Sequence, residues 1–217
     1  MTREMMLVQK KEQILVKITL EDAHSDTRVQ FRPFLAFRNI HKLSKANLYL
    51  NRQYADVPNG IKLRMYDGYP ELHMQLSKNA EFVPVPDWYY NLEYLEEQQR
   101  GYDFKEDLYV PGYFELPMKK GESIIFSAST AEEKPAGLKR RFKAEEALRT
   151  PLDSFTNCLA NSAQQFFVRK NRTTEVLSGF PWLGVRSRDT FIALPGLTIA
   201  MGNDGEAAMD VIKTMLG

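Results

Sequence analysis

Hydrophobic and polar positions alternate through most of the first 130 residues, a pattern typical of half-buried β-strands. The segments QILVKITL (13–20) and RVQFRPFLAF (28–37) are rich in β-branched and aromatic residues. A polar stretch, DAHSDT, separates them, so the two segments are predicted to form a hairpin. Pro33 has no N–H group to donate to a ladder, which indicates an edge or bulge at that point of the second strand.

Three shorter strands are predicted next, separated by the turn signals Asn59-Gly60 and DGYP (67–70). They are ANLYL (46–50), IKLRMY (61–66) and ELHMQL (71–76). The last of them alternates regularly, so Leu72, Met74 and Leu76 are predicted to be buried on one face. His73 is then expected to point to the other face.

The segment from Asp87 to Glu115 combines aromatic and acidic side chains, beginning with Trp88 and three nearby tyrosines. Such a combination can stack on sugar rings and accept hydrogen bonds from hydroxyl groups. Packing within the sheet or at an interface is the favoured interpretation of the aromatics, because aromatic residues contribute heavily to both. The acidic run is expected to be a solvated face. Trp88 is retained as a candidate sugar-binding residue.

The pattern changes near residue 130. Charged residues interrupted by Pro135 and Gly137 predict a linker or connecting helix over residues 131–150. Apolar residues then recur at spacings of three and four, which predicts an amphipathic helix with Pro151 in its first turn and Cys158 on its apolar side. These residues are Leu152, Phe155, Leu159, Ala163, Phe166 and Phe167. A last helix is predicted over NDGEAAMDVIKTMLG, capped near Asn203 or Asp204.

Residues 179–200, GFPWLGVRSRDTFIALPGLTIA, place turn formers, an aromatic, two arginines and a carboxylate next to an apolar helical run. The glycines and proline around Trp182 predict a loop there. Asp189 and Thr190 are typical of a helix N-cap, and Pro195 with Gly196 is expected to interrupt the helix that follows.

The run SRDTFIALPGL resembles a segment of glycogen debranching enzymes, in the amylo-α-1,6-glucosidase part of bacterial and archaeal members. In the same order, FRPFLAFRNIH (31–41), residues 87–115 and GESIIFSAS (121–129) are similar to the later strands of that family's N-terminal β-sandwich. The resemblance spans nearly the whole chain. Arg186 and Ser187 stand where the family usually has Trp-Gly. Counterparts of the family's Gly-rich opening segment and of its long helical domain are expected outside residues 1–217.

The resemblance implies a β-rich fold with an α-helical C-terminal part. Residues 1–130 would be part of an antiparallel β-sandwich, 131–150 a linker or connecting helix, and 151–217 the first helices of an (α/α) barrel. The implied reaction is hydrolysis of α-1,6-glucosidic branch linkages of glycogen or a related α-glucan, with inversion. That chemistry needs a carboxylic acid and a carboxylate base about 6.5–9.5 Å apart.

By the resemblance, Asp189 is the candidate general acid, Arg188 a positioning residue or hydroxyl ligand, and Trp182 an apolar wall for the glucose ring. For the acid role, the surroundings of Asp189 must keep its carboxyl group protonated against the pull of Arg188 and the helix dipole. No second carboxylate is identified as the base, which is expected downstream of residue 217. An N-cap role for Asp189 is the structural alternative.

Composition narrows the classes of protein and the kinds of site. A net charge of +1 argues against a nucleic-acid partner, and no 18-residue apolar stretch could span a membrane. The histidines at 24, 41 and 73 lack metal-ligand spacing, and Cys158 is the only cysteine, so neither a metal nor another cofactor is expected. A charged N-terminus argues against a signal peptide, which makes the cytoplasm the expected location.

Two functions remain open. The chain is either a stretch of a glycogen-debranching glucosidase or a non-catalytic β-sandwich that binds glucan or a protein partner. Glucose release from a branched limit dextrin would distinguish them, and none is expected from this chain alone. If strands preceding Met1 normally pair with the 13–37 hairpin, its open edge predicts self-association of the isolated chain or complementation by a partner.

Overall fold

The computed structural model describes residues 1–170, 173–179, 183–202 and 205–216. The chain divides into two compact units, Met1–Ala147 and Leu148–Gly217. Each unit has its own hydrophobic core.

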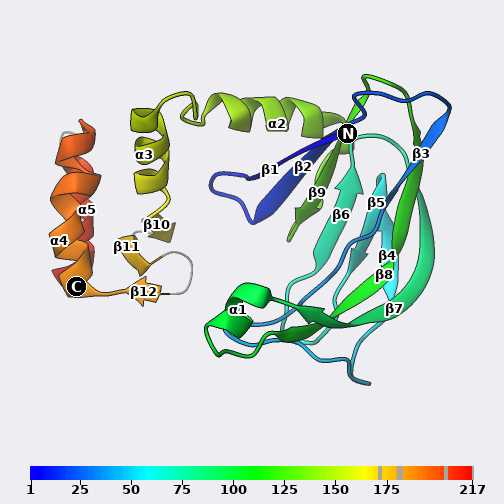
Figure 1. Cartoon of the computed structure of the whole chain (residues 1–217), viewed down its shortest axis with the longest axis horizontal. Helices are drawn as coiled ribbons and strands as arrows, with labels where there is room; N and C mark the ends of the chain where they lie inside the picture. Colours follow the sequence, from blue (N-terminus) through cyan, green and yellow to red (C-terminus); the bar gives the residue numbers. More distant parts are fainter. Residues whose placement is uncertain (171–172, 180–182, 203–204, 217) are drawn as a thin grey trace. The chain divides into compact units, whose positions relative to one another are not determined.

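Two antiparallel sheets form the first unit (Figure 1). The larger has six strands in the order β1 (Thr2–Leu7), β2 (Gln13–Thr19), β9 (Ser123–Ser129), β6 (Leu72–Leu76), β5 (Gly60–Leu63) and β4 (Tyr54–Val57). The smaller has the order β3 (Thr27–Phe31), β8 (Lys105–Met118) and β7 (Glu81–Glu93). Helices α1 (Leu95–Gln99) and α2 (Leu138–Ala147) and the 3-10 turn η1 (Pro135–Gly137) complete the unit.

The core lies between these two sheets, which confirms the predicted antiparallel sandwich. Phe114 on β8 is fully buried and joins the layers, since its ring lies 5.0 Å from that of Phe82 on β7 and 6.2 Å from that of Phe126 on β9. On β6, Met74 and Leu76 are buried in the same core and Leu72 packs against it, as the alternation predicts.

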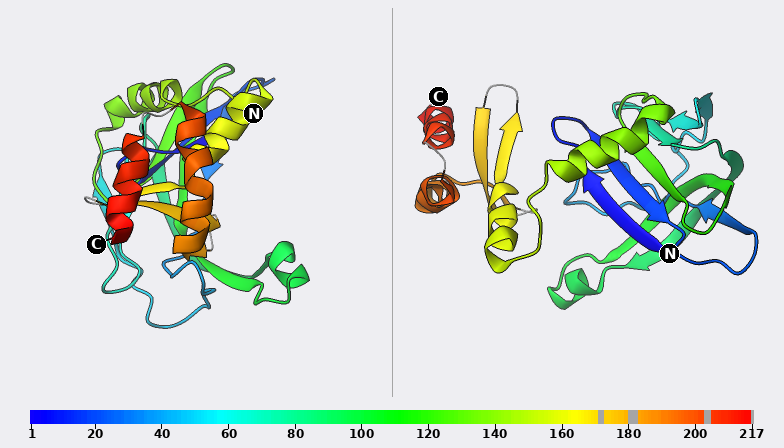
Figure 2. Two further views of the ribbon diagram at one scale, coloured as in Figure 1. Left: turned by 90° about the vertical axis from the view of Figure 1, so that its left-hand side faces the viewer. Right: turned by 90° about the horizontal axis from the view of Figure 1, so that it is seen from above.

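Helix α2 covers part of the outer face of the six-stranded sheet (Figure 2). Its Leu138 and Phe142 pack against Leu15 of β2 and Ile125 of β9. Residues 138–147, expected to be part of a linker or connecting helix, therefore form part of the first unit.

The predicted hairpin over residues 13–37 is wrong. β2 pairs with β1 and β9, whereas β3 pairs with β8 in the other sheet. The polar stretch after β2 leads the chain from one layer of the sandwich to the other. β3 ends at Phe31, before Pro33, and it is an edge strand as that proline indicated.

The predicted strand over residues 46–50 is absent, and Leu48 and Tyr49 are 97% and 90% exposed. The side chain of Asn47 accepts a hydrogen bond from the Tyr49 N–H group at 3.1 Å and donates one to the Lys45 carbonyl at 3.0 Å. These local bonds take the place of a strand ladder.

The second unit contains the sheet β10 (Phe167–Lys170), β11 (Thr173–Gly179) and β12 (Leu183–Val185). Its helices are α3 (Phe155–Gln164), α4 (Ser187–Leu197) and α5 (Glu206–Leu216), with the 3-10 turn η2 (Ile199–Met201) between the last two. Val176 of β11, Leu194 of α4 and Val211 of α5 form its buried core. This unit thus has the expected C-terminal helices together with an antiparallel sheet that the helical expectation for 151–217 did not include.

Helix α3 is shorter than the apolar spacing predicted. Ser154 caps it by accepting a hydrogen bond from the Asn157 N–H group at 3.2 Å, so Pro151 lies before the helix and Phe167 starts β10. Cys158 is exposed and is not the core residue that its helical position predicted. Phe155 and Leu159 on the same helix are 83% and 59% exposed.

Replacing Phe114 with Ala is expected to lower the free energy of unfolding of the first unit by about 3–5 kcal/mol, because the change empties the centre of the sandwich. Urea unfolding followed by tryptophan fluorescence measures this, with the exposed Tyr90→Ala as a matched control that should stay within about 0.5 kcal/mol of wild type. Equal stabilities of the two variants would contradict the assignment of Phe114 to the core.

Self-association through an open strand edge stays a prediction. The open edge was expected at β2, but β1 pairs with β2, so β1 is the edge strand of the sheet. Met5 and Leu7 on β1 are 61% and 67% exposed. Sedimentation velocity of the chain is expected to show concentration-dependent association that Met5→Lys weakens. A concentration-independent monomer would rule this out.

Candidate functional site

The sequence-predicted site lies at the start of α4. Arg186 occupies the N-cap position, so Asp189 is the third residue of the helix and Thr190 the fourth. The N-cap interpretation of Asp189 and Thr190 is therefore wrong, although Asp189 still lies in the first turn. The helix also continues through Pro195 and Gly196 and ends at Leu197.

Arg188 and Asp189 are brought together at this helix end. The Arg188 Nε group donates a hydrogen bond to Asp189 Oδ1 at 3.2 Å. Their side chains differ in exposure, at 84% for Arg188 and 29% for Asp189. Thr190 faces inward, where its hydroxyl group donates a hydrogen bond to the Val176 carbonyl oxygen of β11 at 3.4 Å. This bond and the burial of Leu194 against Val176 fix the helix on the sheet.

This arrangement offers a half-covered carboxylate and a cation that reaches into solvent. A guanidinium group can donate several hydrogen bonds to sugar hydroxyl groups, and a carboxylate can accept them. Service as a general acid would require the neutral carboxylic acid form of Asp189.

The other two sequence candidates are Trp182 and Trp88. Trp182 lies outside the described residues. Trp88 belongs to the first unit, where its side chain is 7% exposed and its ring packs 5.6 Å from that of Tyr109. These are the contacts of a core residue, which favours the packing interpretation of Trp88 over sugar binding.

A buried carboxylate that the sequence did not single out organises one end of the sandwich. Glu106 on β8 is fully buried and accepts hydrogen bonds from Arg38 Nε at 2.5 Å and Arg38 Nη2 at 3.0 Å. It also accepts bonds from the Ser44 N–H and hydroxyl groups at 2.9 and 2.8 Å and from the Tyr94 hydroxyl at 2.6 Å. Both carboxylate oxygens are thus bonded.

These bonds decide the protonation of Glu106. Burial alone would raise the pKa of its carboxyl group, but the hydrogen bonds from Arg38, Tyr94 and Ser44 outweigh burial and lower the pKa from 4.5 to about 2. The same ion pair raises the pKa of Arg38 further above its usual value. Glu106 is therefore an anion at every ordinary pH.

Asp107, the next residue, bonds to a different set of backbone groups. It accepts hydrogen bonds from the N–H groups of Ala46 at 3.0 Å and Asn91 at 2.8 Å, and these bonds lower its pKa. The expectation that this acidic run is a solvated face is therefore wrong for Glu106 and Asp107, which are 0% and 6% exposed.

Beside the loop that these carboxylates hold lie two open cavities, of about 180 and 420 Å³. They share Phe37, Arg38 and Tyr69 in their walls, so they adjoin. We call the pair the Tyr69 groove. Leu72 and Thr130 line the smaller cavity.

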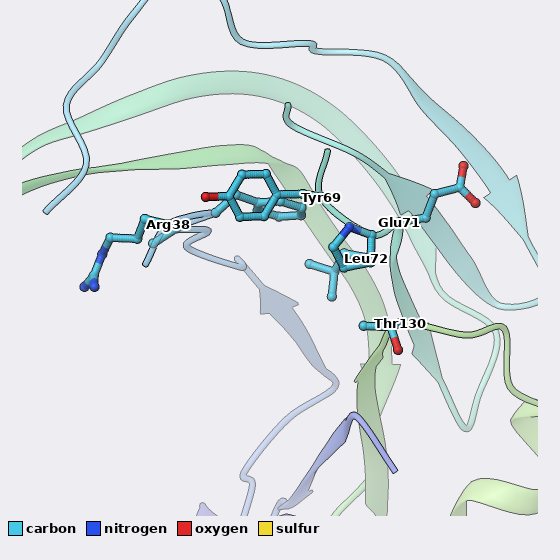
Figure 3. Close-up of a pocket in the computed structure, with 8 residues that line it drawn as sticks. Arg38, Tyr69, Glu71, Leu72 and Thr130 are labelled. Atoms are coloured by element: carbon cyan, nitrogen blue, oxygen red, sulfur yellow. The ribbon is translucent and has the colours of Figure 1, made fainter. Parts of the chain in front are cut away.

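Figure 3 shows how the side chains of the smaller cavity lie. Tyr69 and Leu72 lie close together above Thr130, which stands just past the end of β9. The carboxylate of Glu71 points away from this group and is bonded to Lys62 Nζ at 3.0 Å. The Arg38 guanidinium extends away on the opposite side.

Residues 1–125 match the family model described as glycogen debranching enzyme N terminal. The chain belongs to this family. Searches among curated proteins and among solved structures gave no match. The glycogen debranching enzyme N-terminal match covers both sheets of the sandwich except most of β9, together with the Glu106 bonds and most of the Tyr69 groove, whereas Arg188 and Asp189 lie beyond it.

Among the described residues, no helix is long and apolar enough to cross a membrane. In this glycogen debranching enzyme N-terminal domain the residues that sequence reasoning missed are Arg38, Ser44, Tyr69, Glu106 and Asp107. Only Glu106 and Asp107 carry a sequence signal: these two adjacent acids directly precede the apolar strand segment LYV (108–110), where a solvated pair is not expected.

Glu106→Gln is expected to lower the free energy of unfolding by about 3 kcal/mol at neutral pH, because it removes the charge that Arg38 pairs with in a buried site. Wild-type stability should fall as the pH drops from about 4.5 towards about 2, since protonation of Glu106 favours the unfolded state in that window. The variant should lose much of that slope.

Chemical unfolding at a series of pH values measures both effects. Glu93→Gln provides the matched control, because Glu93 pairs with Lys105 on the surface at 3.0 Å. If Glu106→Gln and Glu93→Gln had the same stability and the same pH slope, the assigned role of Glu106 would be refuted.

Proposed function

We propose that this chain forms part of an enzyme that hydrolyses α-1,6-glucosidic branch linkages of glycogen or a related α-glucan, by acid/base catalysis with inversion. The observation that carries the proposal is the family match over residues 1–125. The formation of one helix by SRDTFIALPGL, with Asp189 in its first turn, adds to it. The substrate class follows from the glycogen debranching family.

In this proposal Asp189 is the general acid that protonates the leaving glycosidic oxygen. Arg188 positions a sugar hydroxyl, for which its exposed guanidinium is suited. Trp182 forms an apolar wall for the glucose ring. A substrate that covers the half-buried carboxyl group of Asp189 would exclude water from the reacting oxygen atom.

Helices α3, α4 and α5 would then be the first helices of an (α/α) barrel. The exposed apolar side chains of α3, Phe155 and Leu159, support this, because such a helix face is suited to packing against further helices. The general base would come from that larger helical domain.

The alternative function is a non-catalytic module that binds glucan or a protein partner. The Tyr69 groove favours it, because that groove belongs to the first unit and uses neither Arg188 nor Asp189. The two functions are compatible in one protein, but only the first requires Asp189.

Asp189→Asn tests the acid role in a polypeptide in which residues 1–217 are followed by a helical glucosidase domain. The variant keeps the size of the side chain and removes its titratable proton, so glucose release from a branched limit dextrin should fall about 10²-fold or more. Binding of the dextrin should change little. Proton NMR of the reaction should show β-glucose as the first product, as inversion requires.

Asp210→Asn on α5 is the matched control, since it makes the same chemical change in the same unit. Its turnover is expected to equal that of the wild type. Retained turnover in Asp189→Asn would remove Asp189 from the acid role, and α-glucose as the first product would exclude inversion.

A further inference from the structure

The Tyr69 groove presents aromatic surface in a fixed orientation. The Tyr69 ring packs edge-to-face with Phe37 at 5.9 Å and with Tyr66 at 6.5 Å. Tyr69 itself remains 38% exposed, so its two neighbours hold the ring while part of it stays open to a ligand. An aromatic side chain held in this way is suited to contact with the apolar face of a sugar ring.

Hydrogen-bonding groups lie beside this aromatic surface. Asn47 donates to the Tyr66 hydroxyl oxygen at 2.8 Å, which leaves the Tyr66 hydroxyl proton directed elsewhere. Lys42 and Lys45 line the same cavity and add ammonium donors. Thr130 lines the smaller cavity, but its hydroxyl group donates a hydrogen bond to Glu12 Oε2 at 3.0 Å. Together these groups match a ligand that carries many hydroxyl groups and an apolar ring face.

The charges of the groove favour a neutral ligand. Arg38 is paired with Glu106, Glu71 with Lys62, and Lys45 lies 4.0 Å from Asp107. The remaining charge of Lys42 is small compared with the cluster of cations that an anionic polymer would require. The volume of the larger cavity, about 420 Å³, falls in the range of ligand sites, which is about 300–1,000 Å³.

The groove is also held in shape before any ligand arrives. Arg38 and Ser44 are bonded to Glu106, and the Ala46 N–H group is bonded to Asp107, so the loop that forms one wall is fixed at three points. A site of this kind loses little conformational entropy on binding. Glu106 and Asp107 therefore fix the shape of the groove wall as well as the packing of the sandwich.

We propose that the Tyr69 groove binds a linear segment of neutral α-glucan, with one pyranose ring on Tyr69 and neighbouring hydroxyl groups on Tyr66 and Lys45. This site lies in the sandwich unit and holds the polymer independently of the Arg188–Asp189 pair. The proposal rests on the proposed function for its ligand class, because the family match names glycogen.

Titration of the full chain with maltoheptaose, followed by isothermal calorimetry and by amide NMR shifts, tests the proposal. Binding at millimolar concentration or tighter is expected, with shifts concentrated in residues 37–47 and 66–72. Tyr69→Ala should weaken binding about tenfold, whereas Tyr69→Phe should retain it because the ring is kept. The exposed Tyr90→Ala is the matched control and should bind as the wild type does.

Several results would overturn the proposal: no binding by the wild type, shifts that avoid the groove, equal affinity of Tyr69→Ala, or displacement of maltoheptaose by inorganic phosphate. If Tyr69→Ala were poorly folded, the NMR shift map of the wild type would still decide. If maltoheptaose does not bind in the groove while hydrolysis still depends on Asp189, this inference alone is refuted. Groove binding without such hydrolysis refutes the catalytic proposal alone.

Discussion

The buried carboxylate of Glu106 is the interaction on which one end of the sandwich depends. A buried charge is costly unless paired and fully hydrogen-bonded, and Glu106 has partners on both oxygens from Arg38, Ser44 and Tyr94. Because those partners come from the 38–44 loop and from the end of the β7 hairpin, one side chain fixes two irregular segments to β8. That attachment also fixes the wall of the Tyr69 groove, because Arg38 and Ser44 form part of it.

This dependence also explains why irregular backbone can form a surface of defined shape here. The loop between β3 and β4 has few backbone hydrogen bonds to the sheets, so side-chain bonds also hold its conformation. Asp107 provides the second attachment by accepting the N–H groups of Ala46 and Asn91. Loop and hairpin are thereby coupled through two consecutive residues of one strand.

Local pattern predicted some of this architecture and missed the rest for identifiable reasons. The strands at 13–19 and 72–76 follow from alternation, because their buried faces are set by neighbouring residues. The pairing of β2 with β9 joins residues more than 100 positions apart, and a plausible turn wrongly suggested a hairpin of β2 with β3. Asp189 was found only by resemblance. Glu106 was missed because a run of acids usually faces water.

The strand order of the larger sheet brings the two ends of the first unit together. β2, near residue 13, pairs along its whole length with β9, which ends at Ser129, and α2 then packs over the β2–β9 pair. Beginning and end are therefore neighbours in one cooperative layer. Because segments from both ends of the unit lie in one layer, a circular permutant that joins its two ends with a short linker should keep the fold.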